Sequence, residues 1–246
     1  MKKQAIIIVT PNLPGSDKLP GAAQDAEAWR SFLLSPEGGA WQLEEIKVLS
    51  DQSTSVIEGV LTLESQKGLD YCLLAFSGHG HYKVLPDSTK ETRLFVSHTE
   101  YFTERTLSVR AKRELVVMDA CREYGGEVIT ENEKISSFSG SRMIRAEDRF
   151  AKAREIFEKA LLLSPEGRTL IYSCSLNQKA GDIFSFTRFL ISDAERLAAE
   201  CRLQQTISVK AAFDAAEAKP LIHNAPQKPV YDAGRCFTHL PFSVSL

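Results

Sequence analysis

Two short apolar runs constrain the fold of this chain more than any other feature, because each ends next to a reactive side chain. Residues 73–76 lead into a Gly-His-Gly motif centred on His79, and residues 115–118 lead into an Asp-Ala-Cys-Arg motif that contains Cys121. Strands buried on both faces of a parallel sheet show such continuous apolar runs, and ligands bind beyond the carboxyl ends of these strands. If the two predicted strands are neighbours, the imidazole and the thiol lie close together.

The rest of the chain alternates between predicted strands and helices. Further strands are predicted at residues 5–9, 45–49 and 169–174. Apolar residues at helical spacing predict helices within residues 22–33, 55–68, 150–161 and 186–201. This alternation indicates βαβ units, whose right-handed crossovers cover both faces of a sheet. We therefore expect one α/β domain over residues 1–246, with a mostly parallel central sheet flanked by helices on both faces.

Three local features refine this prediction. Ser55 and Glu58 have the spacing of a capping box at the start of the second helix. Residues 81–113 are predicted to be irregular, apart from a short strand at 94–97. The long polar stretch at residues 123–147 has no usable periodicity, and we expect it to be a flexible linker.

Composition excludes several kinds of partner. The formal net charge is -2, so an excess of Lys and Arg that would bind nucleic acid or an anionic membrane surface is absent. The apolar runs are much shorter than the ~18 residues of a membrane-spanning helix. The five cysteines are odd in number and lack the spacing of metal ligands. We therefore expect a cytoplasmic protein in a reducing compartment, with no metal and no cofactor.

A cysteine is a useful nucleophile only as the thiolate, so Cys121 needs a neighbouring base. His79 is the candidate base, and the glycines on either side of it allow a substrate to approach the backbone closely. The backbone N–H groups of Gly80 and Cys121 are then the predicted oxyanion hole. His81 lacks the Gly-His-Gly context. The other cysteines, for which structural roles are predicted, are Cys72, Cys174, Cys201 and Cys236.

The two motifs resemble the histidine and cysteine motifs of the caspase-like superfamily of cysteine peptidases, peptidase C14. This superfamily comprises caspases, paracaspases, metacaspases and prokaryotic relatives. Three further segments are similar to the family: residues 19–26, 171–175 and 186–190. The resemblance covers roughly residues 5–191 and implies a cysteine endopeptidase in which His79 and Cys121 form the catalytic dyad.

The sequence departs from caspases at the position two residues before the nucleophile. Caspases have a glutamine there, in a pocket that receives a substrate aspartate, whereas this chain has Asp119. A carboxylate in that pocket would attract a cation, so we expect cleavage after Arg or Lys. The resemblance to metacaspases and paracaspases adds Asp25, Ser77 and, less directly, Asp182 to the same pocket. It also implies that Lys179, Ala180 and Gly181 pair with the substrate backbone as an added strand.

The resemblance also carries expectations about regulation and partners. Self-cleavage, or cleavage by an upstream protease, is predicted in the linker after Lys134, Arg142 or Arg145. The expected partners are protein substrates with a basic residue before the scissile bond and a separate activator or inhibitor protein. Some metacaspases respond to calcium, but this sequence shows no EF-hand pattern. A bacterial cell-death or antiviral-defence cascade is the expected setting.

Two alternatives remain open on the sequence alone. The chain is either an active peptidase or an inactive caspase-like scaffold, although such scaffolds usually lose the histidine or the cysteine. A thiol hydrolase acting on non-peptide acyl substrates would use the same pair of residues.

Overall fold

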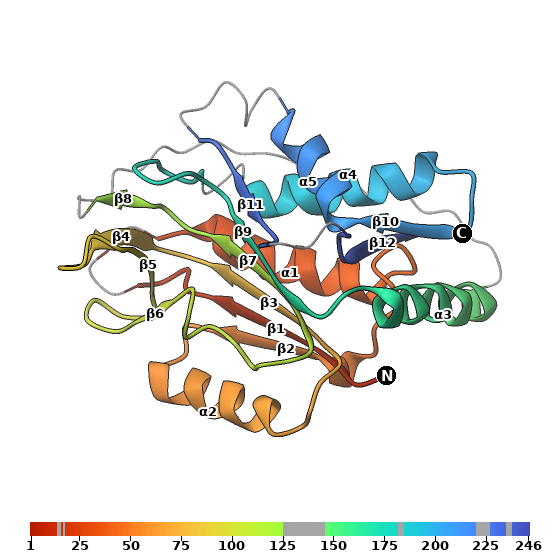
Figure 1. The fold of residues 1–246 in the computed structure, drawn as a ribbon, viewed down its shortest axis with the longest axis horizontal. Coiled ribbons are helices and arrows are strands. Elements are labelled where there is room, and N and C mark those ends of the chain that lie inside the picture. The colour runs from red at the N-terminus through yellow and green to blue at the C-terminus, as the bar shows by residue number, and fades with distance from the viewer. Residues whose placement is uncertain (14–15, 17, 125–145, 182–184, 220–226, 235–237) are drawn as a thin grey trace.

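The computed structural model describes residues 1–13, 16, 18–124, 146–181, 185–219, 227–234 and 238–246. Its centre is a six-stranded sheet with the order β11-β9-β7-β3-β1-β2 (Figure 1). The five parallel strands are β1 (Lys3–Val9), β2 (Ile46–Ser50), β3 (Tyr71–Ser77), β7 (Arg113–Asp119) and β9 (Gly167–Tyr172). The sixth strand, β11 (Val230–Asp232), runs antiparallel to β9. The predicted mostly parallel sheet is confirmed.

The three central strands are buried along their whole length. Every residue of β1, β3 and β7 is buried, which explains the continuous apolar runs in the sequence. The parallel pairing of β3 with β7 confirms that the two predicted strands are neighbours. Because β3 and β7 run in the same direction, the residues that follow them leave the sheet at one edge.

Helices cover both faces of the sheet, as predicted. On one face, Ile57 and Leu61 of α2 (Thr54–Ser65) pack against Ile6 and Leu74 of the sheet. The other face is covered by α1 (Pro20–Leu34), α3 (Ala146–Leu163), α4 (Phe186–Glu200) and α5 (Val209–Glu217) (Figure 1). A short 3-10 helix, Leu43–Glu45, precedes β2.

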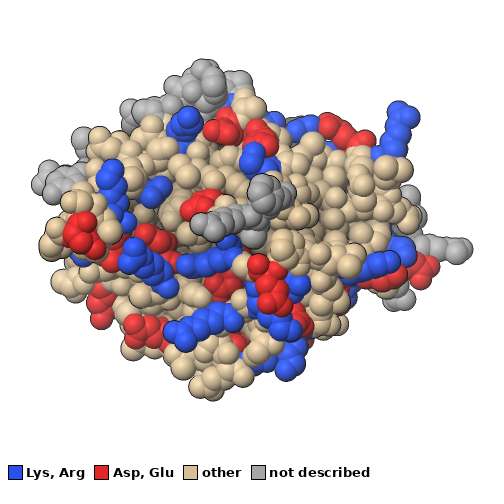
Figure 2. All heavy atoms as spheres, viewed as in Figure 1, with Lys and Arg blue, Asp and Glu red and all other residues tan. Residues whose placement is uncertain are grey.

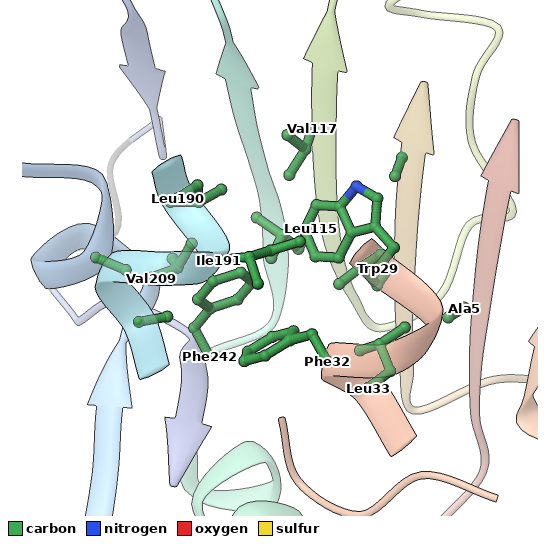
Figure 3. Packing of buried hydrophobic residues seen from close by; sticks show 14 of the residues in the cluster. Ala5, Trp29, Phe32, Leu33, Leu115, Val117, Leu190, Ile191, Val209 and Phe242 are labelled. Atoms are coloured by element: carbon green, nitrogen blue, oxygen red, sulfur yellow. The ribbon is translucent and has the colours of Figure 1, made fainter. Parts of the chain in front are cut away.

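The C-terminal strand β12 (Pro241–Ser245) completes the core on the α1 face. It pairs antiparallel with β10 (Gln205–Ser208). The Phe242 ring lies 5.9 Å from the Trp29 ring and 5.2 Å from the Phe32 ring (Figure 3). The last residues of the chain carry little sequence signal. They nevertheless pack in the same buried cluster as residues of α1, α4 and the central sheet.

A second sheet lies beside the carboxyl edge of the first, with the order β6-β5-β4-β8. Its strands are β4 (Gly80–Val84), β5 (Lys90–Phe95), β6 (Tyr101–Thr103) and β8 (Glu123–Tyr124). The prediction of irregular structure at 81–113 is therefore wrong for much of that range. These strands are short and have polar residues facing solvent, so their sequence lacks a continuous apolar run. The predicted linker is also shorter than expected, because residue 123 begins β8 and residue 146 begins α3.

The predicted capping box is wrong. Helix α2 begins at Thr54, after the N-cap residue Ser53, so Ser55 lies inside the helix. The Ser55 and Ser53 hydroxyls are hydrogen-bonded to each other instead. The N-cap residue Ser53 therefore makes no side-chain capping hydrogen bond to the helix backbone.

The charged residues on the visible face do not form a patch of one sign. Figure 2 shows Lys and Arg side chains interleaved with Asp and Glu side chains across that face. Among the described residues, the helices are too short or too polar to cross a membrane.

Candidate active site

Strands β3 and β7 bring the two predicted motifs together. Ser77 and Asp119 are opposite each other in the parallel register, and the Gly78 N–H donates to the Asp119 carbonyl at 3.1 Å. His79 and Cys121 each lie two residues beyond this pair. The sheet thus places the candidate base and the candidate nucleophile at the same edge.

The two glycines beside His79 are required by close packing. A side chain on Gly80 would place its Cβ 2.8 Å from the Cys121 carbonyl oxygen and 2.9 Å from the Ala120 Cβ. A side chain on Gly78 would place its Cβ 2.0 Å from the Thr10 hydroxyl. The loop that carries His79 therefore packs its backbone directly against the loop that carries Cys121. The imidazole itself is buried, with 7% of the residue exposed.

The Cys121 thiol is half-buried and contacts the segment that follows β9. The Ala180 N–H donates to Cys121 Sγ at 3.4 Å, and Sγ lies 3.8 Å from the Ala180 carbonyl oxygen. Burial raises the pKa of the thiol, while the Ala180 N–H opposes that rise. The carboxylates of Glu123 and Asp119 raise the pKa further. A thiol held protonated in this way needs a base to act as a nucleophile.

Asp25 and Asp119 form a buried pair of acids next to these motifs. Their residues are 0% and 5% exposed. The Ser77 hydroxyl donates to Asp25 Oδ2 at 2.6 Å, and the Ser185 hydroxyl donates to Asp25 Oδ1. The Thr187 N–H, in the first turn of α4, donates to Asp119 Oδ2 at 2.8 Å. The N-terminus of α4 therefore holds both carboxyl groups.

The two acids influence each other's protonation. Burial and the neighbouring Asp119 raise the pKa of Asp25 to about 8. Burial raises the pKa of Asp119 as well, although its hydrogen bonds to Thr187 and Ser173 oppose that rise. Two close carboxylates disfavour each other's charged form. Burial and mutual repulsion therefore favour the protonated form in this pair of acids.

Three residues around the acids were missed by the sequence predictions. Arg188 Nε lies 3.5 Å from Asp25 Oδ1, and Arg188 Nη1 donates to Gln24 at 2.8 Å. Ser185 is the N-cap of α4, and its position just before an apolar helical run is a signal that could have identified it. The hydrogen bond of Ser173 to Asp119 could not be predicted, because Ser173 simply follows strand β9 in the sequence.

Arg122 joins the nucleophile loop to two other parts of the fold. Its guanidinium lies 3.9 Å from the centre of the Tyr172 ring. The same group donates to the Thr92 hydroxyl at 3.1 Å and to the Cys174 carbonyl at 3.2 Å. Cys174 is buried, and burial raises its pKa to about 12. Burial therefore disfavours the thiolate form of Cys174. The Arg122 contacts fix the position of the nucleophile loop.

The remaining predicted site residues have different outcomes. Ser77 contacts Asp25, and the segment Lys179, Ala180 and Gly181 lies beside the nucleophile. Asp182 and the predicted processing sites, Lys134, Arg142 and Arg145, lie outside the described residues. His81 lies in β4, where its ring packs 4.7 Å from the Phe95 ring. Among the described residues, groups of three or more His, Cys, Asp or Glu that could hold a metal ion are absent.

A parallel sheet with a histidine and a cysteine beyond adjacent strands defines a caspase-like α/β protein, and comparison with solved structures supports this class. The fold is similar to that of caspase-1 from Spodoptera frugiperda, with a TM-score of 0.55 and 12% sequence identity over 97% of this chain and 92% of that one. It is also similar to a protein from Geobacter sulfurreducens, with a TM-score of 0.57 and 17% identity over 98% and 100% of the two chains.

The chain belongs to the caspase domain family, whose model matches residues 2–213. This family is one of cysteine peptidases, and the predicted resemblance to it is confirmed. Curated proteins gave no match to the sequence.

Proposed function

We propose that this chain is a cysteine endopeptidase that uses His79 and Cys121 to cleave proteins after Arg or Lys. The observation that carries the proposal is the position of His79 and Cys121 beyond the adjacent strands β3 and β7. The close packing of Gly80 on the Cys121 carbonyl supports it, because the two loops are in direct contact. Membership of the caspase domain family supports the same chemistry.

In the proposed reaction His79 accepts the thiol proton and Cys121 Sγ attacks the scissile carbonyl carbon. The backbone N–H groups of Gly80 and Cys121 hold the oxygen that becomes negatively charged, an effect worth about 3 kcal/mol per donor in other enzymes. The C–N bond then breaks, and His79 gives its proton to the departing amine. Water hydrolyses the thioester and restores the thiol. The formation of the thioester and its hydrolysis both proceed without a metal or a cofactor in this proposal.

The preference for a basic residue rests on Asp25 and Asp119. Both acids lie beside the His79 and Cys121 loops, and Ser77 links Asp25 to the end of β3. A cation that enters a buried carboxyl site favours the charged form of the acids. Binding of Arg or Lys should therefore oppose the rise in the pKa of the two acids and favour their carboxylate forms. Asp182 is part of the same proposal as a third acid.

The proposed partners and setting follow from the family. The substrates are proteins with a basic residue before the scissile bond, and a separate activator or inhibitor protein controls the enzyme. Processing after Lys134, Arg142 or Arg145 and a role in bacterial cell death or antiviral defence are parts of the same proposal. An intact-mass measurement of wild type and Cys121→Ala would test processing, since self-cleavage requires that only wild type be clipped.

A panel of fluorogenic peptides tests the activity and the specificity together. Peptides that place Arg, Lys, Asp or Leu before the fluorophore are compared with an ester of the Leu peptide. We expect turnover only of the Arg and Lys peptides, lost in Cys121→Ala. Cleavage after Asp, or ester turnover alone, would contradict the proposal. A wild type that stays inactive even after cleavage at Lys134, Arg142 or Arg145 would favour the scaffold alternative.

A further inference from the structure

Gln227 is hydrogen-bonded to the segment at residues 180–181 that contacts the Cys121 thiol. This residue is only 6% exposed. Its side-chain Nε2 donates to the Ser173 carbonyl at 2.9 Å, and its Oε1 accepts the Gly181 N–H at 3.1 Å. Both polar ends of the buried amide are thus satisfied by backbone groups. Gln227 lies beyond residues 2–213, the part of the chain that the family model matches.

The Ser173 end of this bridge is fixed to the central sheet. The Ser173 N–H donates to the Met118 carbonyl at 2.9 Å, and the Ser173 hydroxyl accepts the Ala120 N–H at 3.2 Å. Met118 and Ala120 belong to the stretch that ends at the nucleophile. Gln227 therefore connects Gly181, through Ser173, to the same strand that leads to Cys121.

Lys228 adds a second attachment to the same loop. Its N–H donates to the Gln178 side-chain oxygen at 2.7 Å, and its carbonyl accepts from the Ser175 hydroxyl at 2.9 Å. The Gln178 carbonyl in turn accepts the Arg122 N–H at 2.9 Å. The loop at residues 175–181 is consequently fixed on one side by residues 227–228 and on the other by the nucleophile loop.

The position of Gly181 matters for Cys121 because the preceding residue, Ala180, contacts the thiol. The Ala180 N–H points at Cys121 Sγ, at 3.4 Å. A hydrogen bond to the charged form of a group favours that form, so this donor favours the thiolate. If Gly181 moves, the adjacent Ala180 N–H moves with it.

We propose that Gln227 is a positioning residue for the nucleophile: it holds Gly181 so that the Ala180 N–H donates to the Cys121 thiolate. The inference rests on the proposed role of Cys121 as the nucleophile. Gln227 does not touch the reacting atoms and acts through the backbone of residues 180 and 181.

The test measures thiolate formation at Cys121 directly. Wild type and Gln227→Met, which keeps the side-chain length without the two hydrogen bonds, are alkylated with iodoacetamide from about pH 7 to about pH 11, because the thiol titrates above its ordinary range. Peptide mass spectrometry then gives the alkylation rate of Cys121 alone. We expect the pH midpoint of alkylation to rise by about one unit in Gln227→Met, as for the loss of one donor to a charged group.

Two further variants make the result specific. Gln66→Met is the control, because Gln66 is exposed at the end of α2, shortly before β3 begins at the amino edge of the sheet. The midpoint of Cys121 alkylation in this variant should equal that of wild type. Ala180→Pro removes the N–H itself, so it should raise the midpoint to a similar extent. The double variant should show little further rise, because the two changes remove one interaction.

An unchanged midpoint in Gln227→Met or in Ala180→Pro, with a melting temperature close to that of wild type, would overturn the inference. Additive shifts in the double variant would overturn it too. Alkylation needs no peptide turnover, so the result stands apart from the peptide panel. A shifted midpoint in an enzyme without peptidase activity would contradict the proposed function and leave the positioning role intact.

Discussion

Ser77 lies directly opposite Asp119 in the register of β3 and β7, and its hydroxyl donates to Asp25 Oδ2 at 2.6 Å. One side chain at the end of β3 thus connects the strand that leads to His79 with the acid pair. Ser77 therefore links the proposed catalytic residues to the two acids that are proposed to bind the basic side chain of the substrate.

Removal of either member of the dyad should abolish peptide cleavage. We expect Cys121→Ala to remove detectable turnover of an Arg peptide, and His79→Ala to lower kcat by about 100-fold to 10,000-fold, the usual contribution of a general base. His81→Ala is the matched control, since His81 lies two residues further along in β4. Comparable losses in His81→Ala and His79→Ala would show that the base has been wrongly assigned.

Asp119→Asn should weaken basic substrates selectively. The asparagine oxygen can still accept the Thr187 N–H, so the change removes mainly the charge. We expect kcat/KM for Arg and Lys peptides to fall by about 10-fold to 100-fold, the range for losing a charge-assisted hydrogen bond. The exposed Asp232 of β11 provides the control Asp232→Asn. Unchanged kcat/KM for the Arg and Lys peptides would remove Asp119 from the specificity site.

The raised pKa of Asp25 should make stability depend on pH. Asp25 has a pKa of about 8 in the folded protein against an ordinary value of 3.8. Between these values the folded state binds more protons than the unfolded state, so this group's contribution to stability is fully present below about pH 4 and is lost as the pH rises towards 8. Asp25→Asn lacks this dependence.

Urea unfolding of wild type and Asp25→Asn at several pH values tests this prediction. The free energy of unfolding of wild type should fall relative to that of Asp25→Asn as the pH rises through the range between the two pKa values. A difference that stays constant, or that changes in the opposite direction, would show that the folded-state pKa of Asp25 is not raised.

Gly80→Ala should damage the site through the backbone. The new Cβ would lie 2.8 Å from the Cys121 carbonyl oxygen and 3.0 Å from the Arg93 carbonyl oxygen, and neither can move without its strand or loop. We expect a loss of about 1–3 kcal/mol in the free energy of unfolding, together with reduced turnover. Gly59→Ala is the control, because a Cβ there meets nothing within 4 Å in the middle of α2. That change should stabilise the protein by about 0.5–1 kcal/mol, measured by the same urea unfolding.

Phe242→Ala should show that the C-terminal strand is part of the main core. Phe242 is 2% exposed and packs on Trp29 and Phe32. Truncation of such a ring costs about 3–5 kcal/mol, whereas Phe150→Ala, at a residue that is 41% exposed, should cost much less. Similar losses of melting temperature for the two variants would contradict the assignment of β12 to the core.

The sequence by itself determined the five parallel strands of the central sheet and identified the candidate dyad. Strands β3 and β7 are buried on both faces, so burial alone dictates their apolar runs, and His79 and Cys121 follow these runs within a few residues. The pocket roles of Asp25 and Asp119 were predicted from the resemblance of their motifs to the caspase-like family. Each of these residues or strands lies within one short segment whose sequence is informative without knowledge of the rest of the fold.

The tertiary structure alone decided what surrounds those residues. Ser185 reaches Asp25 across 160 positions of sequence, and Gln227 reaches Gly181 across 46. Such contacts depend on how separate elements pack, so the sequence near one residue does not reveal its distant partner. The second sheet and the core position of Phe242 were missed because their strands are short and lack a continuous apolar run, so only the packing of separate elements decides their burial.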